Sequence, residues 1–160
     1  MWRLPFDFVA RKYHFTPAML TAGWEQLARL EVTTPMYGYG DLDALTDLSA
    51  QLFLVTSGFR RLQNSKIRAL GIAPFFAAIH VDAIDESGHC GKQKLFADTL
   101  RVHQFQSHQV LIVGDNHDSE IAAGVRLGLR TVQTLRPGVS RSALAMHHIQ
   151  TLHELRPLLA

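Results

Sequence analysis

The chain has a single cysteine, Cys90, among its 160 residues. One thiol cannot form an internal disulfide, and it cannot build a thiolate metal cage, which needs two to four cysteines at set spacings. The nine histidines are dispersed, apart from the adjacent His147 and His148, and they lack the i, i+4 pairing of helical zinc ligands. The sequence therefore predicts neither a disulfide framework nor a cysteine or histidine metal centre.

Long apolar runs are also absent. No stretch approaches the roughly 18 consecutive apolar residues of a membrane span. The segment 1–15 has neither a long apolar core nor the small-residue cleavage site of a signal peptide. We therefore expect no membrane partner, and we expect the cytoplasm as the compartment.

The chain also has no large excess of charge of either sign. Sixteen Lys and Arg residues stand against fourteen Asp and Glu residues, a formal net charge of +2, and the basic residues are scattered along the chain. Nucleic-acid grooves need basic residues gathered into a stripe or patch, so nucleic acid is not an expected partner. The length, with 47% apolar and 19% charged residues, fits one folded globular domain.

Two unalternating apolar runs are the clearest features present, at residues 52–55 (LFLV) and 110–113 (VLIV). Such runs are typical of parallel strands that helices cover on both faces. Each is followed by a polar loop and an amphipathic segment that ends at a glycine, residues 60–70 before Gly71 and residues 119–127 before Gly128. Each run therefore begins a strand-helix unit.

The remaining elements continue this alternation. We expect strands at 75–81 and 131–135, a helix at 94–102, a turn at 136–138 and a final helical segment at 142–159. The pattern predicts an α/β fold with a doubly wound parallel sheet. Residues 1–38 differ, with helix-like stretches at 8–14 and 17–30 before a Thr-, Pro-, Tyr- and Gly-rich loop at 33–40. We interpret 1–38 as a helical appendage and 39–160 as the α/β domain.

Ligands of an open parallel sheet bind beyond the carboxyl ends of its strands. Thr56, Ser57 and Gly58 follow the first run. They offer hydroxyl groups and free backbone N–H groups at a helix start, which suits an anionic oxygen. The alternative interpretation is that Thr56 and Ser57 only cap the following helix.

A second group of candidates follows the second apolar run. Asp115, Asp118 and Glu120 lie on one loop, where their carboxylates could bind a hard cation such as Mg²⁺. Lys92 and Lys94 stand at the start of the helix between the two runs. An ammonium group there could neutralise phosphate or shield paired carboxylates, although surface lysines are more often simply solvated.

The order of these motifs resembles that of the haloacid dehalogenase-like (HAD) superfamily of phosphatases and dehalogenases. Residues 52–58 (LFLVTSG) resemble the second motif of that superfamily, which implies that Thr56 hydrogen-bonds the transferring phosphoryl group. Residues 91–96 (GKQKLF) resemble the third motif, whose lysine steadies the phosphoryl charge, and the spacing to Phe96 favours Lys92 over Lys94.

Residues 110–124 (VLIVGDNHDSEIAAG) resemble the fourth motif, the acidic Mg²⁺ loop. The resemblance implies that Asp115 is the principal metal carboxylate. The second acid is Asp118 or Glu120, and Glu120 better matches the spacing of four residues between acids in the superfamily, which usually has Asp there.

The first motif of the superfamily, an apolar strand running into Asp-x-Asp, has no clear counterpart in this sequence. Asp41 and Asp43 have the right letters but follow no apolar run, so we expect a helix N-cap pair. Asp7 is a poor candidate because Pro5 interrupts what would be a central strand. Three explanations remain: a chain that begins after the first strand, a natural pseudoenzyme, or a nucleophile supplied by another chain. The cap-like helices near the N-terminus favour the first.

The resemblance implies a Mg²⁺-dependent phosphatase that acts on a small phosphorylated metabolite. The alternative is a non-catalytic domain, either a pseudoenzyme or a truncated HAD domain, that binds Mg²⁺ and a phosphorylated ligand or a protein partner. Without a central strand, sheet edges would be exposed, so we also expect pairing between chains or poor stability.

Overall fold

The computed structural model describes residues 6–159. Its strands are β1 Phe53–Gly58, β2 Ala78–Ala83, β3 Leu111–Gly114, β4 Arg130–Thr134 and β5 His147–Ile149. Its helices are α1 Phe6–Lys12, α2 Pro17–Arg29, α3 Arg60–Leu70, α4 Lys92–His103 and α5 Ala122–Arg126, with 3-10 turns at Leu42–Asp47, Ala73–Phe75, Ser107–Gln109 and Leu152–Leu158 and a π-helical turn at His117–Ile121. None of the helices formed by residues 6–159 is long and apolar enough to cross a membrane.

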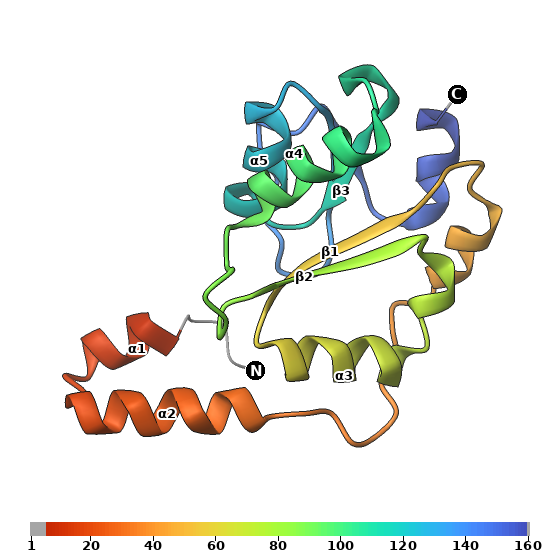
Figure 1. The fold of residues 1–160 in the computed structure, drawn as a ribbon. Coiled ribbons are helices and arrows are strands. Elements are labelled where there is room, and N and C mark those ends of the chain that lie inside the picture. Colours follow the sequence, from red (N-terminus) through yellow and green to blue (C-terminus); the bar gives the residue numbers. More distant parts are fainter. Residues whose placement is uncertain (1–5, 160) are drawn as a thin grey trace.

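The α/β class is confirmed, and every strand pairing is parallel. The strands form two sheets, β1-β2 and β3-β4-β5. Helix α3 covers one face of the β1-β2 pair, and α4 covers the other (Figure 1). The strands formed by the apolar runs thus alternate with helices along the chain, as the sequence predicts.

The two sheets share one apolar core. Phe96 of α4, Ile112 of β3, Ala123 of α5 and the buried Leu129 form a cluster, and Val55 of β1 packs against it. Strand β1 therefore contributes to the core on which the three-stranded sheet packs. In residues 6–159, however, β1 pairs only with β2, and β3 pairs only with β4. One edge of each strand has no ladder partner within this part of the chain.

Local signals placed α3 correctly. It ends at Gly71, which adopts φ 66°, and the Gly71 N–H bonds back to the carbonyls of Ile67 and Arg68. Glycine closes a helix in the left-handed conformation at the least cost because it has no Cβ. The helix expected at 119–127 instead starts with the π-helical turn, continues as α5 and is followed by Gly128 at φ 66°.

The final helical segment expected at 142–159 is wrong. Residues 147–149 form β5, which pairs with β4 through Val132 and His147, and only Leu152–Leu158 is helical, as a 3-10 turn. Pro157 lacks the N–H that an α-helix would need there. The pairing with β4, which lies close in space, outweighs the helical spacing of the sequence.

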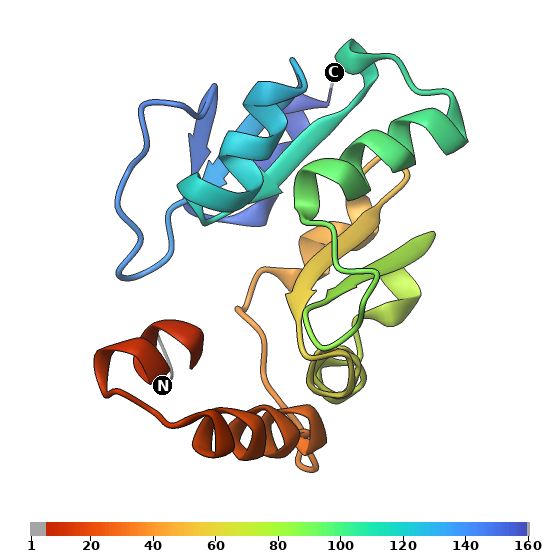
Figure 2. The same cartoon turned by 60° about the vertical axis from the view of Figure 1, so that its left-hand side comes forward.

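Helix α2 and the segment that follows it pack against α3. The rings of Trp24 and Phe59 are in tilted contact with centroids 5.1 Å apart, and the Val32 N–H donates to the Ser65 hydroxyl across 2.8 Å. Figure 2 shows α2 beside α3, whereas α1 lies apart from α3, beyond the other end of α2. The boundary at residue 38 itself stays a prediction.

Candidate functional site

The candidate phosphate turn lies at the carboxyl end of β1. The Thr56 hydroxyl donates to Gln63 Oε1 across 3.1 Å, and the Ser57 hydroxyl donates to Asp82 Oδ2 across 3.2 Å. Gly58 adopts φ 146°, and a Cβ there would collide with the Gln63 side chain. The turn therefore requires glycine, and its backbone can approach an anionic group closely.

Neither hydroxyl of this turn caps α3. The N-cap residue is Phe59, and the side chain that bonds the first N–H group of the helix is that of Asp85, which accepts from the Arg60 N–H across 3.0 Å. The interpretation of Thr56 and Ser57 as helix caps is therefore wrong. Because the single proton of each hydroxyl is donated within the protein, an anion at this turn would meet backbone N–H groups first.

Lys92 is the first residue of α4, and its ammonium group forms an ion pair with Glu120 of the acidic loop. The two side chains are only 13% and 14% exposed. Lys94 instead pairs with Asp98 one turn along the same helix, across 2.8 Å, with its side chain 61% exposed. Asp98 raises the pKa of Lys94 through this hydrogen bond. Only Lys92 therefore faces the acidic loop.

The three acids of the loop have different surroundings. Asp115 is exposed directly after β3, and the buried Gln133 side chain donates to its backbone carbonyl across 3.1 Å. The Asp118 side chain is 84% exposed and lies 3.2 Å from His117. Glu120 is mostly buried, and its Oε2 has no hydrogen-bond partner within the described part of the chain.

Glycine at position 114 permits this arrangement, because a Cβ there would lie 2.8 Å from the Glu120 Cβ. Among residues 6–159, no group of three or more His, Cys, Asp and Glu side chains is close enough to hold a metal ion. Mg²⁺ is commonly held by one or two carboxylates with waters and substrate phosphate. The Asp115 carboxylate and the unpartnered Glu120 oxygen fit that donor set.

Asp41 and Asp7, the weak nucleophile candidates, lie outside this site. Asp41 occupies the N-cap position of the 3-10 turn Leu42–Asp47, as predicted, but its side chain makes no capping hydrogen bond. Its buried carboxylate accepts instead from Arg136 and from the Leu152 N–H, each across 2.7 Å. Asp7 lies in α1, exposed and paired with Arg11. Neither acid follows a strand.

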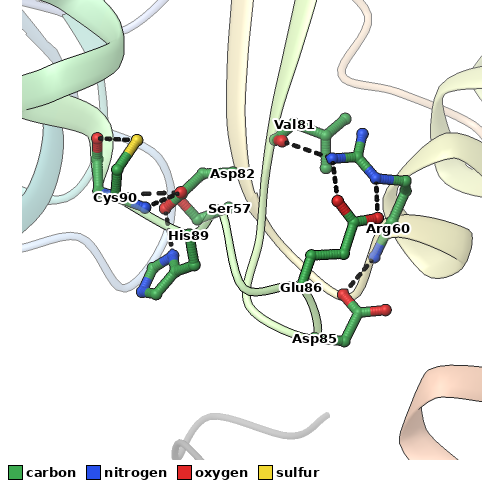
Figure 3. A network of polar contacts seen from close by, with 9 residues as sticks. Ser57, Arg60, Val81, Asp82, Asp85, Glu86, His89 and Cys90 are labelled. Carbon is green, nitrogen blue, oxygen red and sulfur yellow. Dashed lines mark hydrogen bonds and ion pairs between the residues drawn. The ribbon is translucent and has the colours of Figure 1, made fainter.

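Sequence reasoning missed Asp82, the most buried acid near the site. It lies in β2 opposite Ser57, its side chain is 2% exposed, and it contacts Ser57, His89 and the N–H groups of Cys90 and Gly91 (Figure 3). A strand was expected at 75–81, so the rule that site residues follow strand ends could have identified the next residue.

Together these contacts connect the carboxyl ends of three strands. Ser57 touches Asp82, Asp82 holds the backbone before Lys92, and Lys92 pairs with Glu120. The fold and the site thus define an α/β protein whose candidate anion-binding groups and acidic groups lie at one edge of parallel strands.

Sequence comparison identifies the family. The profile described as haloacid dehalogenase-like hydrolase matches residues 18–134, which is more than half of the chain. The chain belongs to the haloacid dehalogenase-like hydrolases. It is 29% identical over 127 residues to the HAD-hydrolase YfnB of Bacillus subtilis, and 25% identical over 168 residues to the pyrimidine 5'-nucleotidase YjjG of Escherichia coli. The YfnB alignment covers 75% of this chain and 53% of YfnB, and the YjjG alignment covers 96% and 69%.

Solved structures show the same fold. The magnesium-bound crystal structure of YfnB superimposes with a TM-score of 0.69 at 22% identity, covering 98% of this chain and 74% of that one. A HAD phosphatase from Thermococcus onnurineus gives 0.65 at 23% identity, covering 97% and 70%. The chain spans about half the length of YfnB in the sequence alignment.

Proposed function

We propose that this HAD-family hydrolase is of the phosphatase type, uses Mg²⁺ and acts on a small phosphorylated metabolite. The observation that carries the proposal is the mostly buried ion pair between Lys92 and Glu120, which joins the lysine motif to the acidic loop. The names of two similar proteins, a HAD phosphatase and a pyrimidine 5'-nucleotidase, support phosphate esters as the substrate class.

Each group of the site has a role in this proposal. The backbone N–H groups of Ser57 and Gly58 bind phosphoryl oxygens, and the Thr56 hydroxyl turns from Gln63 toward the same oxygens. Lys92 offsets the negative charge of the phosphoryl group. Asp115 and Glu120 would hold Mg²⁺, which when bound neutralises charge on the phosphoryl oxygens.

One observation favours a second candidate function. No strand within residues 6–159 ends in an Asp-x-Asp pair, and within these residues β1 and β3 each have an edge without a ladder partner. A carboxylate nucleophile would have to come from another polypeptide segment. The second candidate is therefore a domain that binds Mg²⁺ and a phosphorylated ligand, or a protein partner, without turnover. The cytoplasm remains our proposed compartment, without a nucleic-acid or membrane partner.

Hydrolysis of an aryl phosphate by the purified chain, with Mg²⁺ and with a chelator, tests the proposal. We expect Mg²⁺-dependent turnover that Lys92→Met abolishes and that Lys94→Met leaves intact, because only Lys92 faces the acidic loop. Equal losses in both lysine variants would contradict the assignment. Absence of turnover in a folded chain that still binds inorganic phosphate would favour the binding domain.

A further inference from the structure

Asp82 is a buried carboxylate that the roles above leave unused. Its Oδ1 accepts from the N–H groups of Cys90 and Gly91 across 2.9 and 3.2 Å. Its Oδ2 accepts from the Ser57 hydroxyl across 3.2 Å and lies 2.9 Å from His89 Nδ1. Both oxygens are thus satisfied, and Figure 3 shows the side chain at the centre of these partners.

These contacts keep Asp82 charged. Burial alone would raise the pKa of Asp82, but the hydrogen bonds from the Cys90 N–H, from His89 and from the Gly91 N–H outweigh it, so the pKa is lowered. A buried carboxylate that lacks such donors destabilises the folded protein, because its charge is then neither solvated nor hydrogen-bonded. The position therefore depends on its four partners being in place.

The partners lie on both sides of the candidate site. Ser57 belongs to the phosphate turn after β1, whereas Cys90 and Gly91 end the loop that leads into α4. Gly91 adopts φ 81°, and Lys92 follows as the first helical residue. Fixing two successive N–H groups just before Lys92 sets the direction in which α4 begins.

We propose that Asp82 is a positioning residue, which holds the Ser57 turn against the start of α4 so that Lys92 meets Glu120. The carboxylate does not touch the phosphoryl group; it acts through the Ser57 hydroxyl and through the backbone before Lys92. The effect of this positioning role on phosphate binding rests on the proposed function, whereas the effect of Asp82 on the placement of Lys92 does not.

Competitive acetylation of lysines with a limiting dose of acetic anhydride, read by mass spectrometry, tests the placement of Lys92 without any substrate. In Asp82→Asn the carboxamide places an N–H group where only hydrogen-bond donors converge, so the backbone before Lys92 should lose its anchor. Lys92 would then leave Glu120 and become accessible. We expect its acetylation to rise about tenfold relative to that of Lys66 in α3. Lys66 is the internal reference because global unfolding would raise its labelling as well.

Asp98→Asn is the matched control. It makes the same change on the exposed face of α4, where Asp98 pairs with Lys94, so it should alter Lys94 and leave Lys92 unchanged. If Asp82→Asn does not fold, His89→Ala removes one of the four contacts from the exposed side, and we expect about threefold more Lys92 labelling. Unchanged Lys92 labelling in His89→Ala or in a folded Asp82→Asn overturns the proposal.

Titration with inorganic phosphate then separates the two proposals. We expect Asp82→Asn to bind phosphate about tenfold more weakly than the parent, and Asp98→Asn to bind it equally well. In a Ser57→Ala background, Asp82→Asn should weaken phosphate binding less than it does in the parent, because Asp82 can no longer act through the Ser57 hydroxyl. If the effects of the two substitutions on phosphate binding are fully additive, Asp82 has a purely structural role. A parent protein that binds no phosphate would overturn the proposed function, while Lys92 labelling still decides the role of Asp82.

Discussion

Arg136 and Asp41, separated by 95 positions in the sequence, form an ion pair with 2.7 Å between Nη2 and Oδ2. The two side chains are only 14% and 8% exposed. The same carboxylate oxygen accepts from the Leu152 N–H. The pair therefore joins the 3-10 turn Leu42–Asp47 to the loop after β4 and to the 3-10 turn near the C-terminus.

Replacing Arg136 by Met should destabilise the protein. The buried Asp41 carboxylate would lose its compensating charge, and breaking a buried pair from one side costs about 3–5 kcal/mol. Urea denaturation measures the change in the free energy of unfolding. As a control, Asp43→Asn removes a 75% exposed carboxylate that lies 3.6 Å from His153, and it should change stability by less than about 0.5 kcal/mol.

The contribution of Asp41 should also depend on pH. Burial alone would raise the pKa of Asp41, but the Leu152 N–H and Arg136 outweigh it, so the folded pKa lies below the unfolded value. A depressed carboxyl pKa contributes stability above the unfolded pKa, about 3.9, which is lost as pH falls through the folded pKa. Unfolding free energies of the parent and Asp41→Asn should therefore converge below about pH 4. A constant difference from pH 7 to pH 3 would contradict this.

Gln133 should contribute strongly to stability because its buried amide bonds three backbone groups. Its Nε2 donates to the carbonyls of Asp115 and Ser140, and its Oε1 accepts from the Ser142 N–H. Gln133→Leu leaves these groups unsatisfied, and we expect a loss of about 2–4 kcal/mol in thermal or urea unfolding. The exposed Gln93→Leu serves as the control. A cost below 1 kcal/mol, on the scale of an ordinary surface substitution, would show that the loop relaxes freely.

Titration calorimetry with Mg²⁺ should distinguish the two candidates for the second metal acid. Asp115→Asn should weaken Mg²⁺ binding at least about tenfold, since replacing even a residue that only supports a metal ligand commonly lowers the metal affinity by that factor. We expect Glu120→Gln to weaken it as well, because one buried oxygen of the Glu120 carboxylate has no hydrogen-bond partner among residues 6–159 and could coordinate the ion. Asp118→Asn should have little effect. Normal binding by Glu120→Gln with loss in Asp118→Asn would reverse the assignment.

The edges of β1 and β3 without ladder partners should make the protein associate. Unpaired N–H and C=O groups on a strand edge favour pairing with another chain. We expect sedimentation velocity to show oligomers that dissociate on dilution, and Val113→Lys, a change at a 37% exposed β3 residue, to suppress them. Val125→Lys on α5 is the control. A parent protein that stays monomeric at high concentration would refute the expectation.

Features encoded over a few neighbouring residues could be read from the sequence. The apolar runs gave β1 and β3, and Gly71 marked the end of α3, because burial pattern and left-handed backbone are local properties. The order of motifs was enough for the family, which the match to residues 18–134 shows.

Contacts between distant residues were decided only by the tertiary structure. The motif spacing already favoured Lys92 over Lys94, but its pairing with Glu120, 28 positions along the chain, depends on the packing of α4 against the acidic loop. Residues 147–149 form a strand because β4 lies beside them, despite their helix-like spacing. Asp82 gains its role from partners seven or more positions away, and such partners leave no periodic signal in the sequence.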